Sequence, residues 1–339
     1  MVILGIETSC DETSAAVVED GQKVLSNIVS SSLHLHQKTG GIIPEIAARE
    51  QIKAIIPVLE TALSAAKKKP KDLDALAVTV GHGLIGSLLV GVETAKTLSL
   101  VWNKPIVPVN HLWGHIYACW LEPISNVKFQ MSNLPKFPLV ALVVSGGHTD
   151  LVLMNNHTKH KWLGGTFDDA AGEAFDKIAR FLGLGYPGGP AIEKASKNGS
   201  PKAFNFPRPL ISANNFDFSF SGLKTAVVNL VKKEKSLNKT SISNIAASFQ
   251  QAVVDVLVEK TIRAAQKFEA KGIVVGGGVA ANFALRSQLT NKDKKLGISV
   301  RFAPLEYCGD NGVMIASAAY FNFKPKPISK IQANPSLHF

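Results

Sequence analysis

The chain has 339 residues, of which 46% are hydrophobic, and a formal net charge of +11. This length is sufficient for two hydrophobic cores, so we expect two domains. The longest apolar runs are broken by glycine or are far shorter than the roughly 20 residues needed to cross a bilayer, which argues against a membrane-spanning protein. The three cysteines lack C-x-x-C spacing, which argues against a disulfide framework and a cysteine-ligated zinc site. The positive charge favours an acidic partner such as nucleic acid.

The first residues show no targeting pattern. Met1 to Gly5 lack the charged region of a signal peptide and the Arg/Ser-rich character of a transit peptide, and Glu7, Asp11 and Glu12 follow at once. Together with the odd number of cysteines, this favours the reducing cytosol.

A strand-turn-strand pattern occurs at the start of the chain and again in its second half. Residues 2 to 21 read as an apolar strand, a turn of Thr, Ser, Asp and Glu, and a second strand that ends at Asp20-Gly21. Residues 138 to 154 again read as strand, a turn of small and polar residues, and strand. Two such units, each heading about half of the chain, predict an internally duplicated fold.

Helical and strand-like segments alternate between and after these units. Apolar spacing predicts helices over 45–66, 87–101 and 242–270, and short apolar runs predict strands over 73–80, 105–109 and 273–275. This alternation predicts an α/β fold. Residues 165 to 240 are richer in Gly, Pro, Phe and Asn, as an inserted segment or an active-site loop region would be.

His111 and His115 are four residues apart in a stretch of helical character, H-L-W-G-H. Positions i and i+4 share one face of a helix, so both imidazoles could bind one ion, with a structural histidine pair as the alternative. A zinc protease of the H-E-x-x-H kind needs a Glu directly after the first His, because that carboxylate activates the zinc-bound water. Leu112 occupies this position. The proteolytic interpretation therefore loses its base, while metal binding stays open.

A third metal ligand must come from another part of the chain. Asp310 is the best candidate, in the sequence C-G-D-N-G. It directly precedes an apolar helix expected over 313–320, so an ordinary helix N-cap is an equally good interpretation.

Two glycine-rich turns could offer backbone N–H groups to an anion, although hairpins use Gly-Gly as well. They are V-S-G-G-H-T (144–149) and V-G-G-G-V (275–279). Neither fits the P-loop or the G-x-G-x-x-G pattern. The turn at residues 8–14 carries hydroxyls and carboxylates that suit phosphate and Mg²⁺, unless it is a solvated hairpin.

Asp169, Glu173 and Asp176 have helical spacing and form a single acidic stripe. Such stripes are usually solvated, but Ala, Gly and Phe lie between these residues and suggest partial burial. Buried carboxylates that repel one another need a cation or hydroxyl donors, so we favour a ligand here. Residues 216–225 alternate aromatic and small polar residues, which is compatible with a strand in a core.

Taken together, these motifs are very similar to those of the TsaD family of tRNA threonylcarbamoyladenosine transferases, formerly described as O-sialoglycoprotein endopeptidases. The similarity runs in order over nearly the whole chain. It is carried by G-I-E-T-S-C-D-E-T (5–13), G-G-I-I-P-E (40–45), N-H-L-W-G-H (110–115), S-G-G-H-T (145–149), D-D-A-A-G-E-A-F-D-K (168–177), Y-P-G-G-P (186–190), F-S-F-S-G-L-K-T (218–225), G-G-V-A-A-N (277–282) and D-N-G (310–312). S-G-G-H-T, rather than S-G-G-N-T, favours the bacterial or organellar branch.

The resemblance implies a fold and a division into lobes. The fold is α/β, the duplicated actin/hexokinase-like (ASKHA, ribonuclease H-like) ATPase fold. The N-terminal lobe would span 1–135 and be completed by a C-terminal helix at about 310–339. The C-terminal lobe would span 136–309 and contain an inserted segment at about 165–240.

The resemblance also implies a set of site residues. One divalent metal, iron with zinc as the alternative, would be bound by His111, His115 and Asp310. From the chemistry of the transfer, we further expect Asp11 and Glu12 to be the catalytic carboxylates, near the phosphate or the incoming amine. Asn282 and Asp176 would hold the ribose and adenine end of the ligand. The full set of implied substrate contacts is Val143, Val144, Ser145, Gly146, Gly147, Asp176, Gly189, Asn282 and Glu193, the last at a position where many members have Asp.

The implied reaction moves threonylcarbamoyl from threonylcarbamoyl-AMP to N6 of the adenosine just after the anticodon, in tRNAs that read codons beginning with A. The implied ligands are this adenylate and ATP with Mg²⁺. The implied partners are tRNA and TsaB-like and TsaE-like proteins, with a homodimer as the alternative. The positive charge of the chain would bind the backbone of the anticodon stem-loop.

Two positions depart from the family pattern, and two other functions stay open. His82 stands where members usually have Pro, and Gln51 stands where His is common. Both would affect turn shape or outer contacts rather than ligands. A metal-dependent glycoprotease is one alternative function, against which Leu112 speaks. A non-catalytic scaffold that binds metal and nucleotide is the other.

Overall fold

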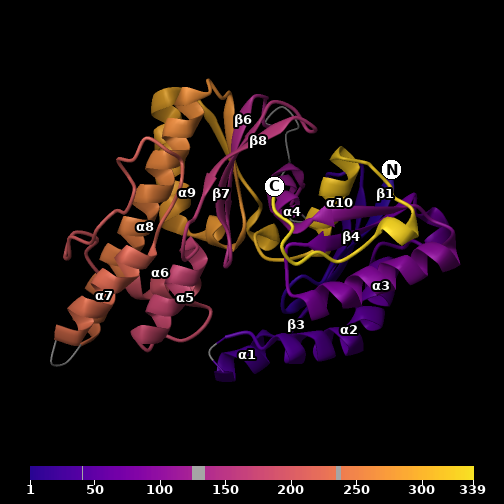
Figure 1. The fold of residues 1–339 in the computed structure, drawn as a ribbon, viewed down its shortest axis with the longest axis horizontal. Helices are drawn as coiled ribbons and strands as arrows, with labels where there is room; N and C mark the ends of the chain where they lie inside the picture. Colours follow the sequence, from indigo (N-terminus) through magenta and orange to yellow (C-terminus); the bar gives the residue numbers. More distant parts are fainter. Residues whose placement is uncertain (40, 124–133, 234–237) are drawn as a thin grey trace. The chain divides into compact units, whose positions relative to one another are not determined.

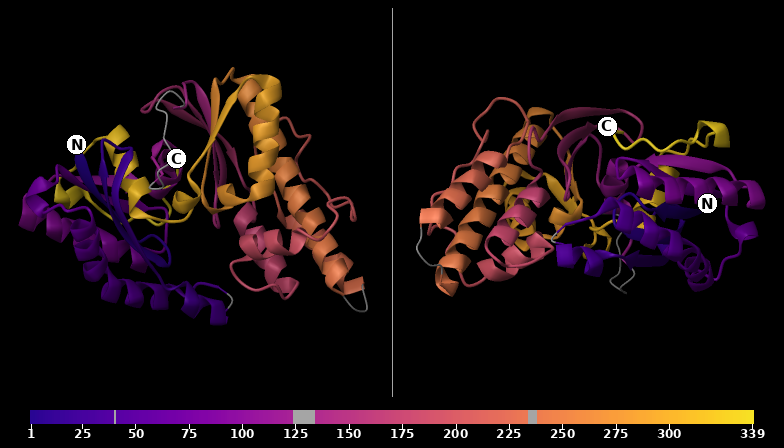
Figure 2. Two further views of the ribbon diagram at one scale, coloured as in Figure 1. Left: turned by 180° about the vertical axis from the view of Figure 1, so that it is seen from behind. Right: turned by 60° about the horizontal axis from the view of Figure 1, so that its bottom comes forward.

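The computed structural model describes residues 1–39, 41–123, 134–233 and 238–339. The chain forms two compact units (Figure 1 and Figure 2). Unit 1 contains Met1–Leu134 and Ala303–Phe339, and unit 2 contains Pro135–Phe302. Each unit is built around one five-stranded sheet.

The sheet of unit 1 has the strand order β3-β2-β1-β4-β5. β1 pairs antiparallel with β2 and parallel with β4, which in turn pairs parallel with β5. The apolar runs of β1 and β4 are buried along their whole length, as expected of central strands covered on both faces. The strands are β1 (Val2–Glu7), β2 (Glu12–Glu19), β3 (Lys23–Ser31), β4 (Ala75–Gly81) and β5 (Ile106–Asn110).

Side chains of β1 alternate between two layers of helices. Leu4 and Ile6 belong to a core that contains residues of α2 and α3. Gly5, between them, faces the other way, and a Cβ on it would lie 2.1 Å from the carbonyl oxygen of Gly312 at the start of α10. The glycine therefore lets α10 pack directly on the sheet. The helices of unit 1 are α1 (Leu33–Thr39), α2 (Pro44–Ala65), α3 (Ile85–Trp102), α4 (His111–Tyr117) and α10 (Gly312–Phe321).

Unit 2 repeats the topology of unit 1. Its strand order is β10-β9-β6-β7-β8, with β6 antiparallel to β7 and parallel to β9. Read from β8, this is the same order and the same strand directions as in unit 1, so the predicted duplication is confirmed. The strands are β6 (Leu139–Val144), β7 (Thr149–Met154), β8 (His160–Gly165), β9 (Gly272–Gly276) and β10 (Ser299–Phe302). The helices are α5 (Ala171–Phe181), α6 (Gly188–Ser196), α7 (Ser221–Lys233), α8 (Lys239–Lys267) and α9 (Phe283–Leu296).

The helix α3 bears on the expectation that the chain does not span a membrane. Among the described residues it is the single helix that is long and apolar enough to span a membrane, judged by length and composition alone. Helices in the core of globular units pass the same test, and α3 packs against α2 and β4 within unit 1. It is therefore weak evidence for a membrane segment.

Candidate functional site

Two histidines of the sequence motif lie on one helix, as predicted. Asn110 ends β5 and caps α4, where its side chain accepts a hydrogen bond of 2.8 Å from the backbone N–H of Leu112. The helix begins at His111, and both His111 and His115 are buried. A short helix that begins directly at the end of a strand therefore presents both imidazoles to one point.

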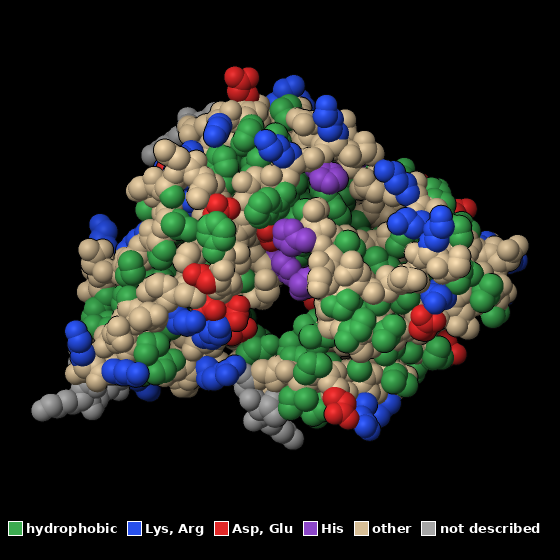
Figure 3. Space-filling view, in the orientation of Figure 1, with side chains coloured by type: hydrophobic (Ala, Val, Ile, Leu, Met, Phe, Trp, Pro, Cys, Tyr) green, Lys and Arg blue, Asp and Glu red, His purple; other side chains and the backbone are tan. Residues whose placement is uncertain are grey.

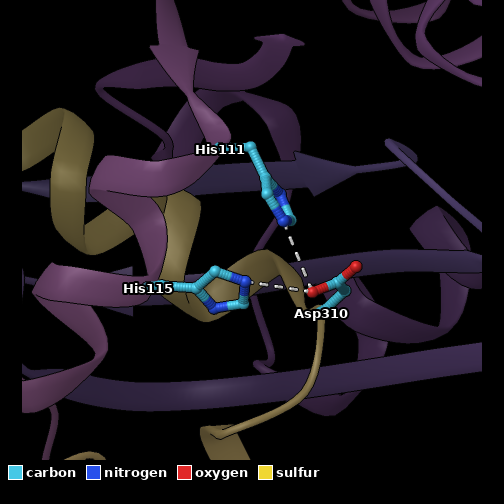
Figure 4. A group of neighbouring side chains, drawn as sticks. All are labelled: His111, His115 and Asp310. Atoms are coloured by element: carbon cyan, nitrogen blue, oxygen red, sulfur yellow. Dashed lines mark ion pairs between the residues drawn. The ribbon is translucent and has the colours of Figure 1, made fainter. Parts of the chain in front are cut away.

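Asp310 completes a cluster with these two imidazoles (Figure 4). Its Oδ1 lies 3.6 Å from Nε2 of His111 and 3.4 Å from Nε2 of His115. The N-cap interpretation of Asp310 is wrong, because Asn311 caps α10 by accepting a hydrogen bond from the N–H of Met314. Asp310 is thus left with its carboxylate directed at the two histidines.

The donor set suits a divalent transition metal. Two imidazole nitrogens and one carboxylate oxygen all lie within 4.8 Å of one another. Three protein ligands of this kind bind iron or zinc and leave open positions for ligand oxygens. The residues present therefore fit a metal ion.

The electrostatics of this cluster are dominated by carboxylates. Burial would lower the pKa of His111, but the charges of Asp310 and Glu7 raise it to about 9. Burial raises the pKa of Asp310 to about 6, although the charge of His111 opposes this. Burial raises the pKa of Glu12 well above its usual value, and repulsion from Asp310 and Asp11 adds to this effect. Such an excess of negative groups favours a bound cation.

The turn after β1 contains Asp11 and leads to Glu12, the first residue of β2, and Gln51 of α2 supports this turn. Nε2 of this buried amide donates to the backbone carbonyls of Thr8, Cys10 and Glu12 at 3.2, 3.0 and 3.0 Å. Gln51 is one of the two departures from the family pattern, and it supports the turn rather than a ligand. The other, His82, follows β4 and is half-buried; its pKa is lowered by burial and by the nearby His111 and His338.

In unit 2 the two glycine-rich turns lie side by side. A Cβ on Gly277 would lie 2.3 Å from the carbonyl oxygen of Val144, so glycine is required for this approach. Gly146 and Gly147 are exposed and have open space where a Cβ would be, which leaves their backbone accessible. Val143 and Val144 end β6 and are buried. Ser145 begins the turn, where its N–H donates to the carbonyl of His148 at 2.9 Å.

Asp176 is joined to the helix that carries Gly189. Its Oδ1 accepts a hydrogen bond of 2.6 Å from the backbone N–H of Gly188, the first residue of α6. Burial raises the pKa of Asp176, which this hydrogen bond partly offsets. Gly189 has open space at its Cβ position. The two predicted contacts are therefore neighbours.

Asn282 lies between α6 and α8. Its Nδ2 donates to Glu193 Oε2 at 3.2 Å and to Gln250 Oε1 at 2.8 Å, while its Oδ1 accepts from the N–H of Leu285 in α9. The two acceptors of the Asn282 amide, Glu193 and Gln250, border a pocket of about 410 Å³, together with the exposed aromatic ring of Phe283. The residues that line this pocket are Glu193, Ser196, Lys197, Gln250, Phe283 and Ala284.

Sequence reasoning missed Gln250 and Glu7. Gln250 occupies a buried position of α8 that Ala246 and Val253 also share, so its signal is a polar residue in an apolar stripe. Glu7 ends the apolar strand V-I-L-G-I-E, where a charged side chain is unusual. In both cases the signal is a polar group at a position that the pattern assigns to the core.

The predicted acidic stripe is wrong in one member. Asp169 lies before the start of α5 rather than on it. Its carboxylate pairs with Lys177 at 2.7 Å and with Lys224 at 2.5 Å, so the cations that it needs come from the chain itself. Residues 216–225 do not form a core strand either, because α7 begins at Ser221.

The two sheets of identical topology define a protein with the duplicated actin/hexokinase-like fold, and unit 1 carries a His-His-Asp cluster beside the turn that follows β1. Solved structures show the same fold. HypF from T. kodakarensis is 14% identical with a TM-score of 0.63, over 95% of this chain and 47% of that one. Component A of (R)-2-hydroxyglutaryl-CoA dehydratase from Acidaminococcus fermentans is 17% identical with a TM-score of 0.52, over 95% of this chain and 98% of that one.

Within that class, the chain belongs to the TsaD family. The family model described as tRNA N6-adenosine threonylcarbamoyltransferase matches residues 23–317. Proteins named tRNA N6-adenosine threonylcarbamoyltransferase are similar over more than nine-tenths of their length. The protein from Thermomicrobium roseum is 51% identical, over 95% of this chain and 92% of its own length. The protein from Thermosipho melanesiensis is 50% identical, over 100% of both chains.

Proposed function

We propose that this chain transfers threonylcarbamoyl from threonylcarbamoyl-AMP to N6 of the adenosine that follows the anticodon in tRNAs reading codons that begin with A. The observation that carries this proposal is the convergence of His111, His115 and Asp310 in a chain about half identical to named threonylcarbamoyltransferases. A bacterial-type enzyme of this kind would work in the cytoplasm.

The cluster would hold one metal ion through Nε2 of both histidines and the carboxylate of Asp310. We expect Fe²⁺, with Zn²⁺ as the alternative, because imidazole ligands suit both metals. When bound, such an ion acts as a Lewis acid toward a ligand oxygen. Asp11 lies in the turn that follows β1, and Glu12 begins β2. Both are the proposed catalytic carboxylates near the phosphate or the incoming amine.

The nucleotide part of the substrate would be held by residues of unit 2. The accessible backbone of Gly146 and Gly147 suits a phosphate, because N–H groups in a turn bind anions. Asn282 and Asp176 would hold the ribose and adenine end, with Glu193 positioned by its hydrogen bond from Asn282. ATP with Mg²⁺ is the alternative ligand of these residues. We propose that residues 1–135 with about 310–339, and residues 136–309, act as the two lobes of the enzyme, with 165–240 as an inserted segment.

The tRNA would be bound through its phosphate backbone. The net charge of +11 supports this, because neutralising phosphates with Lys and Arg releases counterions. Lys and Arg side chains are spread over the face drawn in Figure 3 rather than gathered at one point. Contacts with a large nucleic acid at several points would use such a distribution.

An apolar surface of unit 1 supports the proposal of a TsaB-like helper protein. Ile52 and Ile56 of α2, and Ile85 and Leu89 of α3, are between 44% and 65% exposed. Each pair has i, i+4 spacing, and α2 packs against α3, with Gly86 close to Ala48. Exposed apolar side chains on adjacent helices are typical of a protein interface. A second copy of this chain is the alternative occupant, and a TsaE-like protein would be a further partner.

The deciding experiment is to incubate the metal-loaded protein with threonylcarbamoyl-AMP and unmodified tRNA, with and without TsaB-like and TsaE-like proteins. We expect the modified nucleoside by mass spectrometry, and its loss in Asp310→Ala. Nucleotide binding without product in any combination would support the scaffold alternative. The glycoprotease is not favoured, since Leu112 replaces the general base. Cleavage of a glycoprotein by the wild type, if His111→Ala abolishes it, would reverse this conclusion.

The apolar surface of unit 1 is tested by a separate variant. Ile52→Asp should weaken binding to the TsaB-like protein and leave metal binding unchanged.

A further inference from the structure

Glu7 is a charged side chain with no solvent exposure, and the proposed chemistry gives it no role. It ends β1 directly before the turn that carries Asp11 and Glu12. A buried carboxylate costs free energy unless other groups compensate it, so its surroundings indicate its purpose.

Both carboxylate oxygens of Glu7 are held in place. Oε1 accepts a hydrogen bond of 2.5 Å from the backbone N–H of Ser9. Oε2 accepts a short hydrogen bond from the hydroxyl of Thr79, on the adjacent strand β4, and lies 3.3 Å from Nδ1 of His111. The strand pair β1–β4 therefore fixes the carboxylate against one edge of the imidazole.

The opposite edge of the same imidazole faces the candidate metal position. Nε2 of His111 lies 3.6 Å from Oδ1 of Asp310, as Nε2 of His115 lies 3.4 Å from it (Figure 4). A histidine can bind a metal through Nε2 only when the proton of the neutral ring is on Nδ1. The partner of Nδ1 therefore decides whether His111 is a ligand.

We propose that Glu7 is a positioning residue that holds the proton of His111 on Nδ1 and thereby keeps Nε2 available for the metal ion. A carboxylate can only accept a hydrogen bond, so it favours the Nδ1–H form. Ser9 Oγ lies 3.1 Å from the same Nδ1, but a hydroxyl can donate or accept and so does not select either form. Carboxylate–histidine–metal arrangements orient the ring and strengthen metal binding.

The test is metal affinity, with Co²⁺ alone as the probe of the metal-free protein. We expect Glu7→Gln to weaken Co²⁺ binding by roughly 10–100-fold, because the amide can donate to Nδ1 and favour the wrong form. Ser9→Ala is the matched control, since it removes the other neighbour of Nδ1, and should change the affinity by less than about threefold. Equal affinity in Glu7→Gln and wild type, at equal folded fraction by circular dichroism, would overturn the proposal.

A second measurement does not depend on how well the variants fold. In wild-type protein loaded with Zn²⁺ and labelled with ¹⁵N-histidine, NMR should show His111 protonated at Nδ1 and metal-bound at Nε2. The reverse assignment would overturn the proposal.

A pair of variants at Thr79 tests the support of Glu7. Thr79→Val, which removes one hydrogen bond to Glu7, should weaken Co²⁺ binding, whereas Thr79→Ser, which keeps the hydroxyl, should bind Co²⁺ like the wild type. This inference rests on the proposed metal site but not on transfer to tRNA, so its failure would leave the reaction assay unaffected.

Discussion

Asp310 Oδ1 lies 3.4 Å from Nε2 of His115, although the two residues are 195 positions apart in the chain. The contact exists because α10 packs on β1, where Gly5 permits close approach, and because Asn311 rather than Asp310 caps that helix. The geometry of the metal centre thus depends on packing between segments that are far apart in sequence.

The first prediction concerns this pair. His115→Ala should lower the affinity for Zn²⁺ by more than the roughly 10–100-fold that loss of an outer partner causes, because a direct ligand is removed. Chelator competition and the metal content of purified protein would measure this. His160→Ala, at an exposed position of β8, is the control and should bind Zn²⁺ normally. An unchanged Zn²⁺ affinity in His115→Ala would show that His115 does not bind the metal together with His111 and Asp310.

The second prediction concerns Gln51. Gln51→Leu should lower the free energy of unfolding by about 1–3 kcal/mol, because three carbonyls of the turn lose their donor. Urea denaturation would measure the change. Glu60→Leu, on the exposed face of the same helix, should change stability by less than about 0.5 kcal/mol. Similar values for both variants would mean that the amide does not support the turn.

The third prediction concerns nucleotide binding in unit 2. Asn282→Ala removes the donor to Glu193 and Gln250 and should weaken binding of AMP by about tenfold, which corresponds to about 1.4 kcal/mol. Isothermal titration calorimetry with the full chain would test this. Asn291→Ala, exposed on α9, is the matched control. Equal AMP affinity for the two variants would exclude Asn282 from the nucleotide site.

The fourth prediction concerns the pH dependence of stability at Asp169. Burial would raise the pKa of this carboxyl, but hydrogen bonds from Lys177 and Lys224 lower it below the usual value. In the folded state it therefore stays charged to lower pH than in the unfolded state, and its stabilising contribution is present above the unfolded pKa of about 4. That contribution should disappear as the pH falls through the lower folded-state value.

Comparison of wild type with Asp169→Asn would reveal this dependence. The variant should be less stable at pH 7 by about 0.5–2 kcal/mol, because two partly exposed lysines lose a charged partner, and the difference should shrink as the pH falls below about 4. Urea denaturation at several pH values would measure it. Glu259→Gln, exposed on α8, should show no such trend. A difference that is constant with pH would contradict the ion-pair interpretation.

Several features of the fold were predictable from the sequence. The two strand-turn-strand units appear as β1–β2 and β6–β7, and the helix that carries His111 and His115 is confirmed. These predictions succeed because apolar runs bounded by polar turns, and helical spacing, are local properties of the chain. The prediction that Asp169 lies on the acidic face of a helix was wrong. Its ion pair with Lys224 is a long-range contact, which the spacing of residues does not encode.

The sequence by itself therefore determined the α/β alternation, the duplication, the helix with its two histidines and, through its motifs, the family. Only the tertiary structure decided between a cap and a ligand role for Asp310, and only it placed Glu7 against His111 and Gln51 behind the Thr8–Glu12 turn. Local patterns report which face of an element is apolar. The partners of buried polar groups depend on which elements pack together, and they are therefore known only once the chain is folded.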